Sequence, residues 1–117
     1  MTNVQFPATS LSVSQIGLGT ANLGVDMDDA EVAALINAYR DGGGNHLDTA
    51  HVYAFWTRYG AGSSECAIAR YLRANRWDEL VLATKGGHPG LPGYRRTDRW
   101  LDPCRIRADI EDSLGRL

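Results

Sequence analysis

The sequence of 117 residues predicts an α/β fold in which parallel strands alternate with helices. Three short segments have the composition of strands, and each precedes a segment with the apolar spacing of a helix, in the order β-α-β-α-β-α. The predicted strands end near Thr20, Asp48 and Lys85. Their separation of about 30 residues or more is typical of βαβ units, in which the strands lie parallel.

The chain begins with an irregular segment and a short strand. Residues 4–13 alternate loosely in polarity around Pro7 and Ser10, which predicts a short hairpin or an irregular cap. Residues 15–20, with the sequence QIGLGT, are predicted to form the first parallel strand. The two glycines of this strand would let another group approach its backbone closely.

The first helix has a clear start and end in the sequence. Asp28 can cap it, and Glu31 three residues later completes a capping box. Its apolar face is predicted to consist of Val32, Leu35, Ile36 and Tyr39. Glycines 42–44 end the helix, residues 45–48 form the second strand, and residues 49–62 form a long loop rich in aromatic side chains.

The second half of the chain predicts two helices around a third strand. Ser63 or Ser64 can cap the second helix, whose buried stripe is predicted to be Ile68, Ala69 and Leu72. Residues 80–85 form a nearly continuous apolar run, typical of a strand covered on both faces. Asp102 and Pro103 then predict the start of a third helix. Its buried stripe is predicted to be Ile106, Ile110, Leu114 and Leu117.

Composition and charge favour a small molecule as the partner. With 44% hydrophobic residues the chain can supply the core of one domain, which we assign to residues 1–117. The 12 basic and 14 acidic residues are scattered and give a net charge of -2, so neither nucleic acid nor anionic lipid is expected. No apolar run could span a membrane, and Cys66 and Cys104 are expected to be free thiols, which favours the cytoplasm.

Three polar residues at or just after the strand ends form a candidate catalytic set. Ligands of parallel βα folds meet the carboxyl ends of the strands. If the second and third strands are neighbours, Asp48 and Lys85 lie about 5 Å apart, and Tyr53 follows in the adjoining loop. An ammonium group beside a tyrosine favours the phenolate, so such a tyrosine can protonate an oxygen near neutral pH. Charged strand ends and an aromatic loop that serve only packing are the alternative.

Five segments resemble the aldo-keto reductase family in their order and spacing. They are GNHLDTAHVY at residues 44–53, GSSE at 62–65, ATKGG at 83–87, IGLGT at 16–20 and DSLGRL at 112–117. The Asp-Thr-Ala-x-x-Tyr element within the first of them is specific. The resemblance covers nearly the whole chain.

The resemblance implies a partial (β/α)8 TIM barrel, of which this chain would be the first three βα units with a possible N-terminal hairpin. It implies the transfer of hydride from NADPH to an aldehyde or ketone substrate. Tyr53 would be the general acid, Lys85 would assist its ionisation, and Asp48 would pair with Lys85. The family's cofactor contacts near the nicotinamide ribose map onto Thr20, Ala21 and Asp48.

The same resemblance predicts that the chain is incomplete. A barrel of this kind needs about 250 residues, and the family's catalytic histidine follows a fourth strand that this sequence lacks. His88 lies too close to Lys85 to take that role. We therefore expect the N-terminal part of a reductase that is inactive by itself. A non-catalytic βα fragment that acts through a partner is the alternative, and the substrate, the choice of NADPH over NADH and the oligomeric state stay open.

The histidines and two loops are further candidates for contact with a ligand. His46, His51 and His88 share no metal-ligand spacing, so no metal site is expected, although His51 could touch substrate or cofactor. The insert at residues 54–58 is expected to shape a substrate pocket, where Phe55 and Trp56 either line the pocket or pack over the barrel mouth. A basic and aromatic stretch, interpreted as a solvated loop with a phosphate clamp as the alternative, consists of Tyr94, Arg95, Arg96, Arg99 and Trp100.

Overall fold

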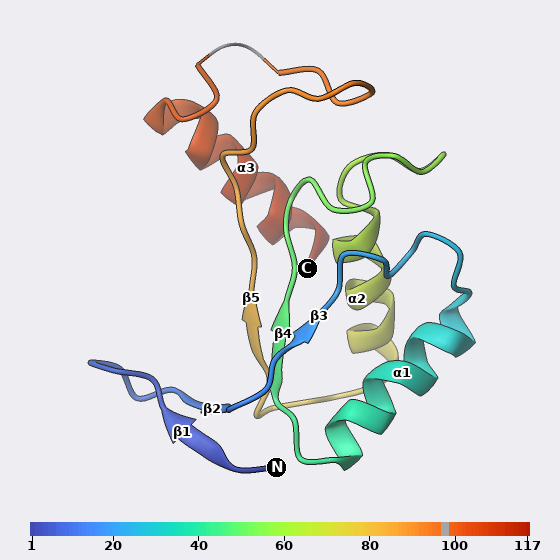
Figure 1. Ribbon diagram of the computed structural model, residues 1–117, viewed down its shortest axis with the longest axis vertical. Helices are drawn as coiled ribbons and strands as arrows, with labels where there is room; N and C mark the ends of the chain where they lie inside the picture. The colour runs from blue at the N-terminus through green and yellow to red at the C-terminus, as the bar shows by residue number, and fades with distance from the viewer. Residues whose placement is uncertain (97–98) are drawn as a thin grey trace.

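A computed structural model describes residues 1–96 and 99–117 and shows an N-terminal hairpin followed by three βα units (Figure 1). The hairpin pairs β1 (Asn3–Gln5) antiparallel with β2 (Ser12–Ser14). A separate parallel sheet has the order β3-β4-β5, with β3 at Leu18–Gly19, β4 at His46–Asp48 and β5 at Val81–Ala83. The helices are α1 (Asp29–Asp41), α2 (Ser63–Ala74) and α3 (Pro103–Arg116). The predicted order and the hairpin are confirmed. No helix in the described ranges combines the length and apolarity needed to cross a membrane.

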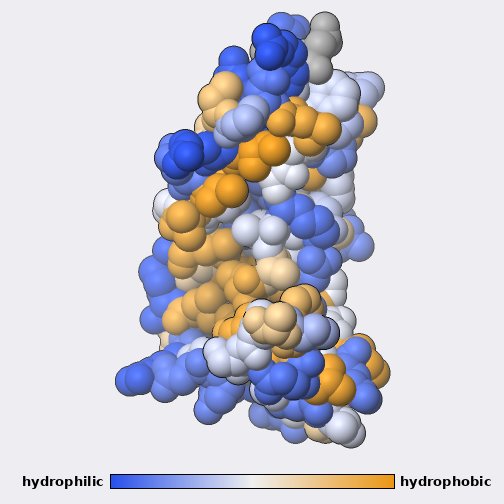
Figure 2. Space-filling model, turned by 90° about the vertical axis from the view of Figure 1, so that its left-hand side faces the viewer, coloured by the Kyte–Doolittle hydropathy of each residue, from blue (hydrophilic) through white to orange (hydrophobic). Residues whose placement is uncertain are grey.

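The apolar core lies between the sheet and helices α1 and α2, which stand on one side of it (Figure 1). Its buried members are Leu23, Val32, Ile36, Leu47, Ala67, Ile68, Tyr71 and Trp77. The expectation that β5 is covered on both faces is wrong, because all three of its residues are only half-buried. Among the described strands β5 pairs with β4 alone. Figure 2 shows the molecule from the left-hand side of Figure 1, the side on which β5 is the outer strand, and a band of apolar side chains lies at the surface there.

The hydroxyl group of Tyr39, on α1, joins the hairpin to the sheet. It lies 2.8 Å from Ser14 Oγ, 2.7 Å from the Ile16 carbonyl oxygen and 3.0 Å from the His46 carbonyl oxygen. Because the Ile16 carbonyl is bonded to this side chain, it is not paired with a neighbouring strand. The strand predicted for residues 15–20 is therefore shortened to the two residues of β3.

The predicted N-cap positions Asp28 and Asp102 are confirmed, but only Asp28 caps its helix through its side chain. Asp28 Oδ1 accepts hydrogen bonds from the amides of Ala30 and Glu31, each at 2.9 Å. Glu31 Oε2 accepts one from the Asp28 amide at 2.9 Å, which completes the capping box. Asp102 makes no side-chain capping bond at the start of α3. Its carboxylate pairs instead with Arg99 at 2.9 Å.

The start of α2 also differs from the prediction. The residue before the helix is Gly62, whose φ of 86° lies in the left-handed region that favours glycine, and neither Ser63 nor Ser64 caps the helix. The Ser64 hydroxyl is buried and donates to the Thr20 carbonyl oxygen at 2.6 Å. This serine therefore ties α2 to the end of β3 instead of capping its own helix.

Two of the predicted apolar stripes are only partly buried. On α1, Leu35 is exposed at the margin of a stripe whose other members are buried or half-buried. On α3, Ile110 and Leu114 are 49% and 73% exposed, so the predicted buried stripe is wrong for these two residues. Ile106 is half-buried, and Leu117 packs against the core. The residues that α3 buries are Asp109 and Ser113. This helix docks through polar contacts, which an apolar pattern does not reveal.

Two ion pairs hold α3 against the rest of the molecule. The Asp109 carboxylate accepts hydrogen bonds from Arg96 Nη1 and Nη2 at 2.6 and 2.9 Å, and from the Gly87 amide at 2.8 Å. Burial raises the pKa of Asp109, but the bonds from Arg96 and Gly87 outweigh this effect and lower the pKa below its usual 3.8. In the last turn of the helix, Arg116 Nη1 donates to Oε2 of the fully buried Glu65 at 2.7 Å.

Gly44 is expected to tolerate no side chain. A Cβ atom at this position would overlap the ring of Tyr39, so Gly44→Ala should lower the free energy of unfolding by about 1–3 kcal/mol. Gly115→Ala is the matched control, because a Cβ there meets no atom within 4 Å and alanine favours a helix by about 0.5–1 kcal/mol. Urea unfolding measures both, and equal stability of the two variants would contradict the proposed overlap.

The ion pair between Asp109 and Arg96 should make stability fall in acid. Because folding lowers the pKa of Asp109, its contribution to stability is complete above the usual pKa of 3.8 and is lost as the pH falls toward the lower pKa of the folded state. Asp109→Asn should therefore cost about 3 kcal/mol at neutral pH, with a gap to the wild type that narrows below about pH 4. Thermal unfolding across this range is the measurement, and a constant gap would argue against the ion pair.

Candidate active site

The carboxyl ends of β4 and β5 bring the predicted catalytic residues together. In the parallel register, Asp48 lies opposite Ala83. The pairing continues past the strand ends, since the Thr49 amide donates to the Ala83 carbonyl at 2.8 Å. Two residues later the His51 amide donates to the Lys85 carbonyl at 2.9 Å. The segment after β4 therefore runs beside the segment after β5 as far as Lys85.

The ammonium group of Lys85 lies between the side chains of Asp48 and Tyr53. Its Nζ donates to Asp48 Oδ1 at 2.7 Å, to the Thr49 carbonyl at 2.8 Å and to the Tyr53 hydroxyl oxygen at 3.2 Å. These acceptors match the three donors of an ammonium group. Burial lowers the pKa of Lys85, but hydrogen bonds to Asp48 and Tyr53 outweigh it and hold the pKa above 10.5. Lys85 is therefore charged at neutral pH, next to a tyrosine hydroxyl.

The predicted cofactor residues lie at the ends of β3 and β4. The buried Thr20 bonds to the Asp48 carbonyl oxygen through both its amide and its hydroxyl, each at 3.0 Å. Ala21, which follows it, is half-buried. The side chain of Asp48 is 40% exposed, so its carboxylate can accept a hydrogen bond from a ligand.

His51 is engaged away from the Lys85 ammonium. It is buried, and its Nδ1 lies 3.3 Å from the Tyr94 hydroxyl. Its Nε2 lies 3.3 Å from Asp112 Oδ2, on α3. Both ring nitrogens thus have partners within the chain, and the contact of His51 with substrate or cofactor stays a prediction.

The basic stretch before α3 is solvated only in part. Arg95 and Arg99 are exposed, as a solvated loop predicts. Tyr94 and Arg96 are not, since Tyr94 is buried and the Arg96 side chain is 13% exposed. The guanidinium of Arg96 donates to the Tyr94 hydroxyl at 3.0 Å as well as to Asp109. The prediction is wrong for these two residues because α3 supplies a buried carboxylate.

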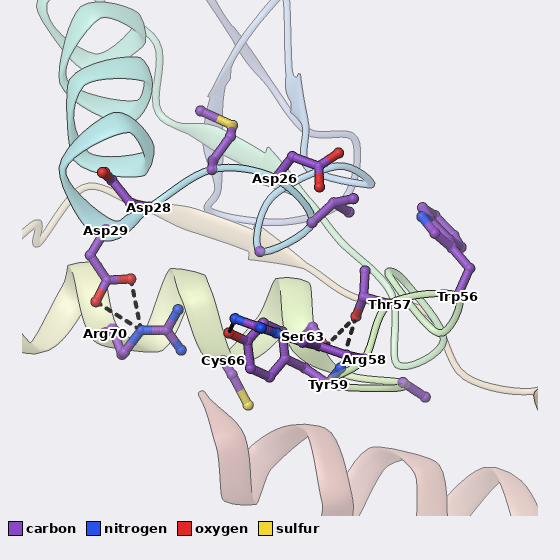
Figure 3. Close-up of a pocket in the computed structure, with 14 residues that line it drawn as sticks. Asp26, Asp28, Asp29, Trp56, Thr57, Arg58, Tyr59, Ser63, Cys66 and Arg70 are labelled. Atoms are coloured by element: carbon purple, nitrogen blue, oxygen red, sulfur yellow. Dashed lines mark hydrogen bonds and ion pairs between the residues drawn. The ribbon is translucent and has the colours of Figure 1, made fainter.

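A cleft of about 1230 Å³ lies between the loop after β3 and the loop after β4 (Figure 3). Figure 3 shows Trp56 at one end of it and the ion pair of Asp29 with Arg70 at the other. Residues 56–58 of the insert line this cleft, where Trp56 is 53% exposed. Phe55 packs against a neighbouring apolar cluster, with its ring edge-on to that of Trp56 at 5.2 Å between centroids. The described residues that line the cleft do not include the predicted catalytic set.

The polar residues of α3 that reach toward the strand ends were not predicted from the sequence. Asp109, Asp112 and Arg116 recur at i, i+3 and i+7, so they share one face of the helix. Charged residues at this spacing are usually interpreted as a solvent-facing stripe, and their partners lie far away in sequence. Within the described part of the chain, no group of three or more His, Cys, Asp or Glu residues is arranged to hold a metal ion.

Comparison with known proteins identifies relatives of this chain. The model of the aldo/keto reductase family matches residues 15–117. An uncharacterised oxidoreductase, YrpG of Bacillus subtilis, is 36% identical over 113 residues, which cover 93% of this chain and 34% of that protein. A 6-dehydroglucose reductase of Novosphingobium aromaticivorans is 35% identical over 117 residues, which cover 97% of this chain and 36% of that protein.

Solved structures show the same relationship. The aldo-keto reductase AKR11C1 from Bacillus halodurans, in its holo form, superimposes with a TM-score of 0.75 at 29% identity. The match covers 100% of this chain and 36% of that structure, so the three βα units correspond to part of a (β/α)8 barrel. The chain spans about a third of the length of the curated relatives it matches. With the family model matched over most of its length, the chain belongs to the aldo/keto reductase family.

Proposed function

We propose that the gene product carrying this chain is a nicotinamide-dependent reductase that converts an aldehyde or ketone into an alcohol, with NADPH as the hydride donor. The observation that supports this most strongly is the position of the Lys85 ammonium, 2.7 Å from Asp48 and 3.2 Å from the Tyr53 hydroxyl. A charged lysine beside a tyrosine hydroxyl favours proton donation by that tyrosine.

In this proposal Tyr53 is the general acid. When bound, the dihydronicotinamide supplies a hydride to the carbonyl carbon. The carbonyl π electrons pass to the oxygen, which takes the proton of the Tyr53 hydroxyl, so an alcohol and a phenolate result. The Lys85 ammonium stabilises this phenolate, and Asp48 holds the ammonium in place. A proton from solvent then restores Tyr53.

Thr20, Ala21 and Asp48 are proposed to lie against the cofactor. The exposed carboxylate of Asp48 suits a ribose hydroxyl, because hydrogen bonds to charged acceptors are strong. Space for a ligand is available beside β3, where a Cβ atom added to Gly19 would meet no atom within 4 Å. The substrate is proposed to be a small carbonyl compound, and the free thiols of the chain suit the reducing cytoplasm.

Tyr53→Phe should remove carbonyl reduction while keeping cofactor binding. The substitution deletes only the acidic hydroxyl, so kcat should fall by about 10²–10⁴-fold, the usual worth of general acid catalysis. The oxidation of NADPH by the purified gene product with an aldehyde panel measures turnover, and cofactor fluorescence measures binding as the control. Wild-type kcat in this variant would exclude Tyr53 as the acid.

Lys85→Ala should be rescued in part by an added amine. Removal of the ammonium should lower kcat by about 10²-fold or more, as the loss of one charge-stabilising donor does elsewhere. Added ethylammonium can occupy the space left between Asp48 and Tyr53 and should restore part of the activity. The same amine should do nothing for Tyr53→Phe. Wild-type kcat for Lys85→Ala without added amine would contradict the role of the lysine.

A further inference from the structure

We propose that a hydrogen-bonded chain from α3 through Tyr94 to His51 positions Tyr53 and Lys85 for proton transfer, and that Tyr94 is its central positioning residue. This inference rests on the proposed function, because it concerns the same reaction. It adds residues from the loop before α3 and from α3 itself.

In the proposed order of donors, the hydrogen bonds run from Arg96 through Tyr94 and His51 to Asp112. Arg96 can only donate, so the Tyr94 oxygen accepts from its Nη1 at 3.0 Å. The hydroxyl proton of Tyr94 is then available to Nδ1 of His51 at 3.3 Å. With Nδ1 as acceptor, the neutral imidazole carries its proton on Nε2, which donates to Asp112 Oδ2 at 3.3 Å. The proposed order of donors gives His51 this tautomer.

Both ends of this series of hydrogen bonds, at Arg96 and at His51, are held by carboxylates of α3. Asp109 binds the guanidinium of Arg96 through two hydrogen bonds, and Asp112 lies one turn further along the same helix. Burial raises the pKa of Tyr94 above 10.0 despite the nearby Arg96, so the hydroxyl keeps its proton and stays a donor. The helix therefore holds a defined arrangement of donors and acceptors beside the strand ends.

The series of hydrogen bonds is linked to Tyr53 and Lys85 through the backbone of their segments. The His51 amide donates to the Lys85 carbonyl at 2.9 Å, and His51 lies two residues before Tyr53. On the other segment, Asp109 binds the amide of Gly87, two residues after Lys85. Each of the two segments that carry a catalytic side chain is thus fastened to α3.

The Tyr94 ring adds an apolar contact to the same segment. It is buried with Ala50 and Val52, and Tyr53 and Phe55 pack against this cluster. The hydroxyl of Tyr94 bonds to Arg96 and His51, and the Lys85 ammonium bonds to other groups. Tyr94 therefore acts through the loop, and its loss should change the position of the reacting groups. A shift of about 1 Å at such groups can cost about 10²-fold in rate.

The decisive experiment compares Tyr94→Phe with Tyr71→Phe in the purified gene product, with NADPH and an aldehyde. Both variants lose one hydroxyl from a buried ring, and the Tyr71 hydroxyl bonds to Asn37 at 2.7 Å, between α1 and α2. We expect Tyr94→Phe to lower kcat by about 10-fold or more while the KM for NADPH changes by less than about twofold. Tyr71→Phe should leave kcat unchanged at a similar loss of thermal stability.

A second pair of variants covers the case in which Tyr94→Phe fails to fold. Asp112 is largely exposed, so its substitution should not prevent folding. Asp112→Asn keeps an acceptor for Nε2 of His51 and should retain nearly wild-type kcat. Asp112→Ala removes the acceptor and should lower kcat, with a change in the His51 ring nitrogen shifts by NMR. Equal kcat for both Asp112 variants and unchanged shifts would overturn the proposal.

Failure of the proposed function would look different from failure of this inference. In that case the wild type would not reduce carbonyls, or Tyr53→Phe would do so as fast as the wild type. Hydrogen exchange of the His51 amide, which bonds to the Lys85 carbonyl, then decides the positioning role. Faster exchange in Tyr94→Phe than in Tyr71→Phe would support the link to Lys85, and equal exchange would overturn it.

Discussion

The parallel register of β4 and β5 is the constraint on which the rest of the site depends. It sets Asp48 opposite Ala83, and the backbone bonds that follow continue as far as Lys85. The lysine side chain then has only to reach back to a carboxylate on the neighbouring strand. Because side chains alternate along a strand, a slip of one residue would turn Asp48 into the core and bring Leu47 to the site. The burial of Leu47 therefore protects the position of Asp48.

The position of α3 is held by buried polar contacts rather than by strand register. Its buried side chains are Asp109 and Ser113, whereas the more apolar Ile110 and Leu114 are exposed. An apolar contact tolerates sliding, but a buried carboxylate is stable only when its hydrogen bonds are complete. Asp109 has three such bonds, which restrict the rotation of the helix about its axis. The loop that carries Tyr94 is held in place by the same contacts.

Local signals account for the parts of the fold that were predicted. The capping box at Asp28 needs only residues within one helical turn, and the hairpin needs only the turn between its strands. The serine cap predicted for α2 does not form, because the Ser64 hydroxyl bonds to Thr20, more than one βα unit earlier. The strand at residues 15–20 was shortened for a similar reason, since Tyr39 takes one of its carbonyl groups. Competition from distant partners is invisible in a local pattern.

By itself the sequence determined the order of strands and helices, the family resemblance, and the proximity of Asp48, Tyr53 and Lys85, because parallel strand ends must meet at one edge of a sheet. The tertiary structure alone decided that Lys85 bonds to Asp48, Thr49 and Tyr53 at once. It also decided that His51 faces α3 and which charges are buried. Those outcomes depend on partners brought together from separate βα units, and the free energy of a charged group depends on its partners rather than on its own identity.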